Sequence, residues 1–423
     1  MEAAIVKQNT HWQKKKYTNL IDREQVTNVL ERLYLKEVQV LRGVRRSGKS
    51  SIIKLVINKL SETEDAKSIL FLNFDDPFFI SISQDPTNLY LLVETAEKIT
   101  GTKVKYLFLD EIQNIYMWEK YVKTAYDNEF FEKIIVTGSN TNLMSGEYAT
   151  LLSGRYISHN IYPFSIKEIL KFKGYNNLLD IINNKSDVLN IIDDMMQYGS
   201  FPQVFKTNIK HKREVLISYY ETILVKDCVL NNNIRDAKLL KYLTHFLISN
   251  NAKVYSYRSI AKAVGSNENT IRDYIEILKN SYIIDEINNF SYSLKIGARQ
   301  KNKNYCVDNG LIEAISFKFS ENKGRLLENL VFTEYRKAGY KEIYFYNQTK
   351  ECDFIFKKDN KLMAVQVSYE LSEHNKDREI NALWEVKRKF GITDLKIITY
   401  NTTEKIEGIS VEPIWKIAFD LMV

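Results

Sequence analysis

Cysteines are few in this sequence, and long apolar runs are absent. The three cysteines, Cys228, Cys306 and Cys352, lie far apart without a C-x-x-C pair. Their odd number and wide spacing argue against a disulfide framework and a structural zinc site, and favour a reducing compartment. The chain has no stretch of about 18 apolar residues, which a membrane-spanning helix would require. The N-terminus also lacks the apolar run of a signal peptide. We therefore expect a cytoplasmic protein with no membrane partner.

Neither sign of charge is in large excess. The 60 Lys and Arg residues against 53 Asp and Glu residues give a formal net charge of +7. Basic residues are interspersed with acidic ones, as on an ordinary solvated surface, so the charge permits contact with nucleic acid without requiring it. The 423 residues exceed what one hydrophobic core usually serves, and we expect two or three domains.

A glycine-rich loop occupies residues 43–50. Its sequence, Gly-Val-Arg-Arg-Ser-Gly-Lys-Ser, matches the G-x-x-x-x-G-K-[ST] pattern of a phosphate-binding loop, or P-loop. Residues 36–41 alternate like a strand, and residues 51–60 have apolar side chains at helical spacing. Strand, loop and helix in this order are the context that the motif requires. The predicted ATP-binding residues are Gly43, Val44, Arg45, Arg46, Ser47, Gly48, Lys49, Ser50 and Ser51.

The residue types in this loop suit phosphate chemistry. Gly43 and Gly48 allow the backbone to wrap a phosphate with its N–H groups pointing inward, where a side chain would block the approach. The helix that follows presents its positive end to the anion. We expect Lys49 to reach the β and γ phosphates and the Ser50 hydroxyl to ligate magnesium. The predicted cofactors are therefore ATP and Mg²⁺.

A second motif begins with an apolar run at residues 106–109, Tyr-Leu-Phe-Leu, which is typical of a buried parallel strand. Asp110 and Glu111 follow it. Ligands of open α/β sheets bind outside the carboxyl ends of the strands, so this acidic pair should lie beside the phosphates. We predict that Asp110 holds the magnesium shell and that Glu111 polarises the attacking water, as a hydrolase requires. A pair of exposed acids that ends a strand is the alternative.

Two further strands are predicted around these motifs. Residues 68–74 lie between the motifs in the sequence, and a strand inserted there should place the motif strands apart in the sheet, as in ATPases with a catalytic glutamate. Residues 133–137 form the other strand, and a polar side chain after it could reach the γ-phosphate or the attacking water. Asn140 is the preferred candidate, followed by Ser139. A helix N-cap is the alternative role.

Three arginines are candidates for contact with phosphate. Arg155, in Leu-Leu-Ser-Gly-Arg-Tyr, is the best candidate to neutralise transition-state charge, either in cis or from a neighbouring subunit. A surface arginine is the alternative. Arg45 and Arg46 lie within the loop and are interpreted as positioning or solvated residues. The predicted catalytic residues are thus Glu111, Asn140 and Arg155.

These motifs together resemble one branch of the AAA+ ATPases, an archaeal and bacterial group in which a C-terminal domain of unknown function with a nuclease-like end follows the ATPase module. The resemblance covers most of the chain and implies ATPase activity, with DNA handling as a further role. It implies an α/β P-loop NTPase core of the AAA+ (ASCE) type with a parallel sheet. The motifs that carry the resemblance are Leu-Arg-Gly-Val-Arg-Arg-Ser-Gly-Lys-Ser, Leu-Phe-Leu-Asp-Glu-Ile-Gln, Val-Thr-Gly-Ser-Asn, Leu-Ser-Gly-Arg-Tyr, Tyr-Pro-Phe-Ser at 162–165, Tyr-Gly-Ser-Phe-Pro at 198–202, the segment 324–331 and the segment 351–354.

The same resemblance and the element pattern divide the chain into four parts. A helical lid follows the ATPase core, a winged helix-turn-helix follows the lid, and a restriction-endonuclease-like α/β domain ends the chain. The predicted boundaries are 1–165 for the core, 166–245 for the lid, 246–295 for the winged helix and 296–423 for a linker with the nuclease-like domain.

The winged helix is predicted from residue spacing. Residues 256–264 and 268–279 have the apolar spacing of two short helices, and residues 282–287 and 289–292 resemble a hairpin. Polar residues of the second helix, such as Arg272, could contact DNA. Acidic neighbours dilute the positive charge, so the affinity of this helix alone for phosphates would be weak. Packing or contact with a protein partner is the alternative role.

Residues 326–399 predict a helix–strand–strand–strand–helix–strand order, which resembles the restriction-endonuclease core. In such sites carboxylates bind magnesium while a lysine orients the water. Glu328 and Asp353 match the acidic positions, but Gln366 and Ser368 replace the glutamate and the lysine of the third motif. Two carboxylates without the third and without a cation should hold magnesium poorly. We therefore expect an inactive domain that binds nucleic acid or a partner.

Catalysis of DNA cleavage would need a substitute lysine, and Lys350 and Lys361 are the candidates.

The leading hypothesis is an ATP-hydrolysing AAA+ protein whose nucleotide cycle moves the lid and the C-terminal modules against a partner, with DNA as one candidate and a protein or a homo-oligomer as others. A slow nucleotide switch that scaffolds an interaction is the second hypothesis. An ATP-controlled nuclease is the third.

Overall fold

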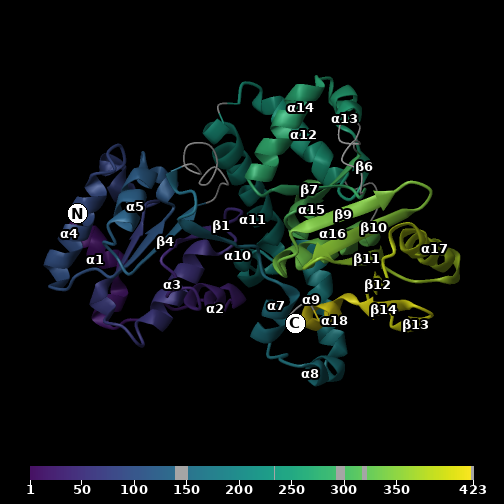
Figure 1. The fold of residues 1–423 in the computed structure, drawn as a ribbon, viewed down its shortest axis with the longest axis horizontal. Coiled ribbons are helices and arrows are strands. Elements are labelled where there is room, and N and C mark those ends of the chain that lie inside the picture. Colours follow the sequence, from purple (N-terminus) through teal and green to yellow (C-terminus); the bar gives the residue numbers. More distant parts are fainter. Residues whose placement is uncertain (139–150, 233, 292–300, 317–321, 421–423) are drawn as a thin grey trace. The chain divides into compact units, whose positions relative to one another are not determined.

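The computed structural model describes residues 1–138, 151–232, 234–291, 301–316 and 322–420 (Figure 1). The chain divides into two units, Met1–Tyr162 and Pro163–Val423. Each unit contains a β-sheet of its own.

The first unit is built on a five-stranded sheet of parallel strands in the order β2-β3-β4-β1-β5. β4 lies between β1, which leads into the P-loop, and β3, which ends in Asp110. The motif strands are therefore apart, as predicted, but the inserted strand β2 lies at the edge of the sheet instead of between them. The strands are β1 Val38–Arg42, β2 Ile69–Asn73, β3 Tyr106–Asp110, β4 Lys133–Gly138 and β5 Tyr156–Asn160.

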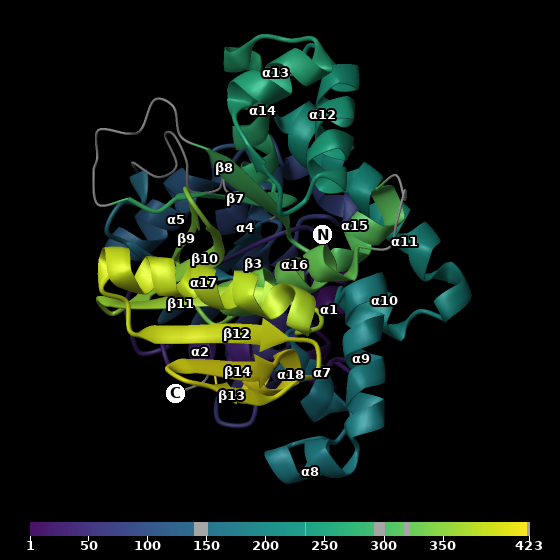
Figure 2. The same cartoon turned by 90° about the vertical axis from the view of Figure 1, so that its right-hand side faces the viewer.

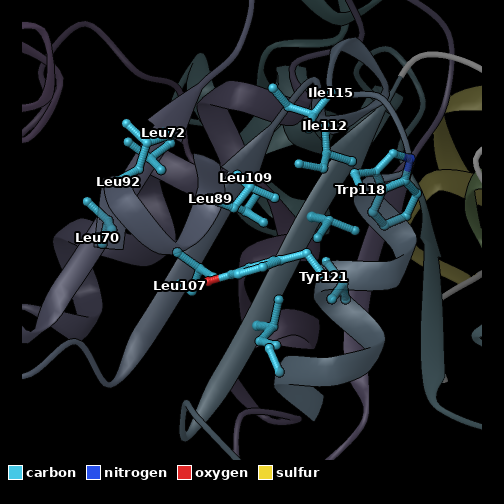
Figure 3. Close-up of a cluster of buried hydrophobic side chains, with 14 of the residues drawn as sticks. Leu70, Leu72, Leu89, Leu92, Leu107, Leu109, Ile112, Ile115, Trp118 and Tyr121 are labelled. Atoms are coloured by element: carbon cyan, nitrogen blue, oxygen red, sulfur yellow. The ribbon is translucent and has the colours of Figure 1, made fainter. Parts of the chain in front are cut away.

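Helices cover both faces of this sheet because its strands are apolar on both sides. On one face, α3 packs against Leu41 and Phe71. On the other face, α4 and α5 pack against Leu72 and Leu109, and Figure 3 shows Trp118 of α5 in this cluster. The helices are α1 Glu2–Gln8, α2 Glu24–Leu30, α3 Lys49–Leu60, α4 Asn88–Thr100 and α5 Trp118–Asp127, with short 3-10 helices at Thr10–Gln13, Ala66–Ser68, Pro77–Ile82 and Ile112–Asn114.

The N-terminal segment covers the edge of β2 with side-chain amides. Buried Asn9 donates from Nδ2 to the Phe71 carbonyl at 2.9 Å and accepts from the Phe71 N–H at 2.8 Å. Gln8 pairs with the backbone of Asn73 in the same manner, at 3.3 and 2.8 Å. An open strand edge offers unpaired N–H and C=O groups to other chains. These two amides therefore satisfy backbone groups that would otherwise be open.

The second unit combines helices with a nine-stranded mixed sheet in the order β13-β14-β12-β11-β10-β9-β7-β8-β6. Its strands are β6 Val254–Tyr255, β7 Ile284–Asn289, β8 Asn302–Cys306, β9 Glu342–Asn347, β10 Glu351–Lys358, β11 Lys361–Ser368, β12 Asp394–Thr399, β13 Glu404–Ile406 and β14 Ile409–Pro413. Its α-helices are α7 Ile166–Phe172, α8 Leu178–Asn183, α9 Lys185–Tyr198, α10 Pro202–Lys206, α11 Ile209–Thr222, α12 Ala237–Ser249, α13 Tyr257–Val264, α14 Glu268–Asn280, α15 Asn309–Ile315, α16 Lys323–Lys337, α17 Glu373–Phe390 and α18 Ile414–Asp420. A π-helical turn at Ile223–Val229 and a 3-10 turn at Leu230–Asn232 follow α11.

The two helices predicted for the winged helix are present as α13 and α14, but the predicted hairpin is wrong in its second strand. Ser256 and Asn267 cap the two helices by accepting N–H groups of their first turns. β7 runs to Asn289 and pairs antiparallel with β8, and residues 290 and 291 form no strand. β7 also pairs parallel with β9, so the sheet continues across the predicted boundary at residue 295. Strand pairing between distant segments depends on packing, which the local residue pattern does not show.

The predicted order of the C-terminal elements is confirmed by α16, β9, β10, β11, α17 and β12. Neighbouring residues of a strand point to opposite faces of the sheet. Accordingly, Phe356 stacks on Tyr335 of α16 with ring centroids 3.9 Å apart, whereas Ile355 packs in the same cluster as Leu383 of α17. The two helices thus cover opposite faces, and Figure 2 shows α17 lying across the strands on its side.

The motif Gly199-Ser200-Phe201-Pro202, predicted to interrupt the helices, contacts a buried aspartate. The Asp308 carboxylate accepts hydrogen bonds from Ser200 N–H at 2.7 Å, from the Ser200 hydroxyl at 3.1 Å and from Gly310 N–H at 2.9 Å. A Cβ at Gly199, whose φ is +70°, would lie 1.6 Å from an oxygen of this carboxylate. The glycine is therefore required where α9 ends.

Candidate nucleotide-binding site

The P-loop lies between β1 and α3, as predicted. Gly48 has φ +102° and forms the N-cap of α3. Gly43 has φ +152°, and a Cβ at this position would lie 2.0 Å from the carbonyl oxygen of Ile161. Both glycines are therefore required by the backbone. Gly43 is also required by close packing on the residue that follows β5, a reason that the sequence pattern did not reveal.

Lys49 lies inside the loop. The residue is 4% exposed, and its Nζ donates to the carbonyl oxygens of Gly43 at 2.9 Å and Val44 at 3.2 Å. The Ser47 hydroxyl is also buried and has no hydrogen-bond partner. The other loop residues differ in exposure: Arg45, Ser50 and Ser51 are partly buried and Arg46 is exposed.

Asp110 and Ser50 come together although 60 positions separate them in the sequence. Burial and the neighbouring Glu111 carboxylate raise the pKa of Asp110 to about 6, while hydrogen bonds from Thr137 and Ser50 and the Lys49 charge oppose the rise. The Asp110 Oδ2 atom is buried without a hydrogen-bond partner of good geometry. A serine hydroxyl beside a carboxylate oxygen that lacks a partner is an oxygen donor set that suits magnesium.

Glu111 is held in an unusual backbone conformation. Its φ is +54° and ψ is +46°, in the left-handed region that a residue with a side chain rarely adopts. The Glu111 N–H donates to the Thr137 hydroxyl at 3.0 Å, and the carboxylate accepts from the side-chain amide of Gln113 at 2.6 Å. Such strain persists only where the surroundings determine it, and it is frequent at functional sites.

The sequence patterns missed two residues that support this site. The Thr137 hydroxyl donates to Asp110 Oδ1 at 2.5 Å and accepts from Glu111 N–H, so it links both acids. Buried Arg23 donates to the Ser47 carbonyl at 3.0 Å and to the Tyr162 carbonyl at 2.8 Å. Thr137 is the last residue of the predicted strand 133–137, and this position makes it a candidate for a polar contact at the site, as it does Asn140. Nothing in the sequence around Arg23 identifies it.

Arg155 lies at the opposite end of the sheet from the P-loop. Its carbonyl oxygen accepts from Val38 N–H at the amino end of β1, whereas the P-loop follows the carboxyl end of the same five-residue strand. Its guanidinium donates to Asp127 at 2.9 Å. This position does not fit the alternative that Arg155 acts in cis, because a strand of this length separates Arg155 from the loop by more than ~13 Å. The role from a neighbouring subunit stays a prediction. Asn140 and Ser139 lie outside the described residues.

The two residues that replace the third nuclease motif both form hydrogen bonds. The Gln366 amide oxygen accepts from Asp353 N–H at 3.1 Å, and the Ser368 hydroxyl donates to the Glu370 carbonyl at 2.9 Å. Lys361 pairs with Lys358 at the β10–β11 turn, five residues along β10 from Asp353. Lys361, one of the two candidates for a substitute lysine, therefore lies too far from Asp353 for that role.

A different lysine, Lys303 of β8, contacts both Glu328 and Asp353. Lys350 lines a cavity together with Glu328 and Asp353. The residue pattern did not indicate Lys303, because this lysine precedes the predicted motif and is brought to it by the pairing of β8 with β7.

Within the described parts of the chain, no helix is both long enough and apolar enough to cross a membrane. In the same residues, no group of three or more His, Cys, Asp or Glu side chains is arranged to hold a metal ion. Ser50 and Asp110 are a different kind of ligand set, because they supply one hydroxyl and one carboxylate.

Solved structures with some similarity include the Aeropyrum pernix ORC1 protein in complex with DNA and AMPPCP-bound DnaA from Aquifex aeolicus. The first is 12% identical with a TM-score of 0.31 and covers 70% of this chain and 92% of its own. The second is 18% identical with a TM-score of 0.27 and covers 60% of this chain and 86% of its own.

Family models match three consecutive parts of the chain. An AAA domain matches residues 35–170, and two domains of unknown function match residues 189–322 and 323–417. The AAA domain and the parallel sheet with its P-loop identify the first unit as an AAA+ P-loop ATPase fold, as the resemblance implied. This fold binds nucleotide, typically with magnesium.

Two relatives match nearly the whole chain. An uncharacterized protein of Methanocaldococcus jannaschii, MJ1544, is 34% identical over 406 residues, which cover 91% of this chain and 89% of the relative. An uncharacterized protein of Haemophilus influenzae is 31% identical over 381 residues, which cover 88% of this chain and 92% of the relative. The chain therefore belongs to the same family as these proteins, in which an AAA+ P-loop ATPase domain precedes two domains of unknown function.

Proposed function

We propose that this protein binds Mg-ATP at residues 43–51 and hydrolyses it. The observation that carries the proposal is the approach of Ser50 and Asp110 at the start of α3. Two oxygen donors from separate motifs meet where the N-terminus of α3 and the Lys49 ammonium supply positive charge. Helix N-termini and the P-loop lysine are the groups that hold the phosphates of bound nucleotides.

The residues around Asp110 fit a magnesium ion. Asp110 Oδ2 is buried and lacks a partner, which is costly unless a ligand supplies one. The Ser50 hydroxyl would complete the protein's share of the ligands, and the nucleotide and water would provide the rest. When bound, the ion would neutralise charge on the phosphates. Lys49 would release the Gly43 and Val44 carbonyls and donate to the nucleotide instead.

Glu111 is the residue that we assign to the attacking water. Glu111 is 8% exposed, and its carboxylate accepts a hydrogen bond from Gln113. The carboxylate therefore has a defined position beside Asp110. A carboxylate fixed near the γ-phosphate orients water and accepts its hydrogen bond. Gln113 is accordingly a positioning residue, because it contacts the carboxylate and not the nucleotide.

We further propose that hydrolysis is coupled to movement of the second unit and that the protein acts as a homo-oligomer. The position of Arg155 away from its own P-loop supports this assembly, since an arginine that neutralises transition-state charge can come from a neighbouring subunit. DNA is the candidate partner for α13 and α14. The ion pair of Arg272 with Glu268 at 3.2 Å, and its position 4.3 Å from the Tyr257 ring centroid, leave this arginine less available for a phosphate.

Two variants test the nucleotide chemistry. Lys49→Ala should lose Mg-ATP binding in a calorimetric titration, because the phosphates lose their ammonium contact. Glu111→Gln should retain the wild-type affinity and lose phosphate release. Equal hydrolysis by wild type and Glu111→Gln would remove Glu111 from the mechanism. Unchanged affinity in Lys49→Ala would contradict the whole assignment. Binding with hardly any turnover in the wild type would instead support the slow nucleotide switch.

DNA contact is tested by gel shift of a duplex oligonucleotide across salt concentration. Binding that weakens as salt rises is the expected result, because phosphate contacts release counterions. Arg272→Ala should weaken it only slightly, given the ion pair with Glu268. No binding at low salt would remove DNA from the proposal and leave the ATPase assignment intact.

A further inference from the structure

A buried lysine lies among three carboxylates in the second unit. Lys303 of β8 is 1% exposed. Its Nζ lies 2.7 Å from Glu351 Oε1, 3.1 Å from Glu328 Oε1 and 3.5 Å from Asp353 Oδ1. Glu328 belongs to α16, and the other two acids belong to β10. Three elements therefore bring one cation and three anions to a common point.

Other groups hold these carboxylates in place. The Tyr305 hydroxyl donates to Glu328 Oε1 at 2.7 Å, and the Val367 N–H donates to Asp353 Oδ2 at 2.9 Å. The pairing of β10 with β9 shifts register between Cys352 and Ile355, so Asp353 lies in an irregular stretch of the strand. Such irregularities redirect side chains beside functional sites. The acids are thus fixed by the fold around the ammonium group.

The carboxylates need a cation to remain charged together. Burial and the Glu328 carboxylate raise the pKa of Asp353 well above its usual range, and the Lys303 charge opposes this rise. Buried charges are tolerated when they are paired and hydrogen-bonded. Lys303 is the cation that contacts all three acids.

The geometry around Lys303 suits an ammonium group better than a magnesium ion. The three N–O distances span 2.7–3.5 Å, whereas magnesium requires oxygens at about 2.0–2.1 Å. Gln366 cannot supply a further ligand easily, because Asp353 N–H and the Glu379 carboxylate engage both ends of its amide.

We propose that the ammonium group of Lys303 takes the place of a divalent cation among Glu328, Glu351 and Asp353. The cluster is then complete without a metal, and this domain does not cleave phosphodiesters by metal-assisted catalysis. A cavity of about 650 Å³ borders the acids and includes the 41%-exposed Glu351 side chain. An added cation could therefore reach the cluster if the ammonium were removed.

The variant Lys303→Met removes the charge and keeps most of the side-chain volume. Because it leaves the buried Glu328 and Asp353 and the partly exposed Glu351 without their cation, its unfolding midpoint should fall by roughly 10 °C. Ca²⁺, which accepts longer and more flexible oxygen contacts than magnesium, should restore at least half of this loss. It should not restore the double variant Lys303→Met with Asp353→Asn, and it should leave wild type unchanged. Lys301→Met, a change to an exposed lysine at the start of the same segment, is the matched control and should behave as wild type.

All these measurements use the full chain without nucleotide, so they do not depend on the P-loop. A wild-type midpoint raised by Ca²⁺ or Mn²⁺, with the effect lost in Asp353→Asn, would overturn the proposal. So would a folded Lys303→Met variant that gains no response to Ca²⁺. If Lys303→Met does not fold, calorimetry with Mn²⁺ decides: wild type and Asp353→Asn should give the same titration, because any ion held by Ser50 and Asp110 is common to both, and a binding event present only in wild type would refute the inference. Magnesium-dependent DNA cleavage by wild type that disappears in Asp353→Ala would refute it as well.

Discussion

Thr137→Val offers a sharp test of how the nucleotide site is positioned. Valine has nearly the shape of threonine, so the change removes the hydroxyl with little effect on packing. Thr137 is fully buried, and its hydroxyl donates to Asp110 Oδ1 and accepts from Glu111 N–H. The variant therefore leaves one carboxylate oxygen and one backbone N–H without these partners.

The size of the effect follows from these two contacts. A hydrogen bond to a charged group contributes about 1.5–3 kcal/mol, and an unsatisfied buried N–H costs about 1–3 kcal/mol. Some of this cost is relieved by movement of Glu111 out of its left-handed conformation, so we expect a loss of about 3 kcal/mol in unfolding free energy. Displacement of Glu111 that costs about 2 kcal/mol in the transition state would lower kcat about thirtyfold.

Urea unfolding and phosphate release measure the two effects, with Thr137→Ser as the control that keeps the hydroxyl. The Val variant should also need more Mg²⁺ for half-maximal activity, because the hydrogen bond that lowers the pKa of Asp110 is gone. Thr137→Ser should remain close to wild type in all three assays. If the Val variant equals wild type in stability and turnover, Thr137 does not position the acids.

Three further predictions concern other parts of the molecule. Asn9→Ala should lower the unfolding free energy by about 2–4 kcal/mol, since it leaves both backbone groups of Phe71 unpaired; urea unfolding measures this, and the less buried Gln8→Ala should cost less. Arg155→Ala should keep Mg-ATP affinity and lose concentration-dependent turnover if the arginine acts on a neighbouring subunit. Lys123→Ala, which removes the other partner of Asp127, is the control and should keep this turnover. Equal turnover in both variants would contradict the role. Burial raises the pKa of Asp308 from its ordinary value of 3.8 to about 6, so the folded protein favours the protonated carboxyl. The contribution of Asp308 to the unfolding free energy is therefore full below pH 3.8 and falls by about 3 kcal/mol as the pH rises from 3.8 through 6. Asp308→Asn should abolish this part of the pH dependence in denaturant titrations between pH 4 and 7, and a slope unchanged from wild type would show that Asp308 does not titrate there.

Elements with strong local patterns were predicted well. The strands at residues 106–109 and 133–137 and the helix after the P-loop lie within a residue or two of β3, β4 and α3. Buried parallel strands are continuously apolar and amphipathic helices have a regular spacing, so both signals are present in short segments. The same holds for α13, α14 and the strands β9 to β12, whereas α16 and α17 begin three and five residues earlier than predicted.

Pairing between distant segments was predicted poorly. β8 was missed as the partner of β7, and with it the arrival of Lys303 beside Asp353. Asn302–Cys306 carries two asparagines and a lysine that are all buried, so its polar sequence does not resemble a core strand. Burial of these polar residues depends on partners that lie elsewhere in the chain, such as Glu328 for Lys303.

The sequence by itself determined the P-loop, because eight consecutive residues between a strand and a helix contain all the conformational requirements of that turn. It also determined that Asp110 lies at the carboxyl end of a buried strand. Only the tertiary structure decided that Thr137 and Arg23 support the loop and its acids, and that Arg155 lies at the far end of the sheet. The physical reason is that strand order and burial depend on packing between segments far apart in the chain, and residue spacing records only the neighbours along it.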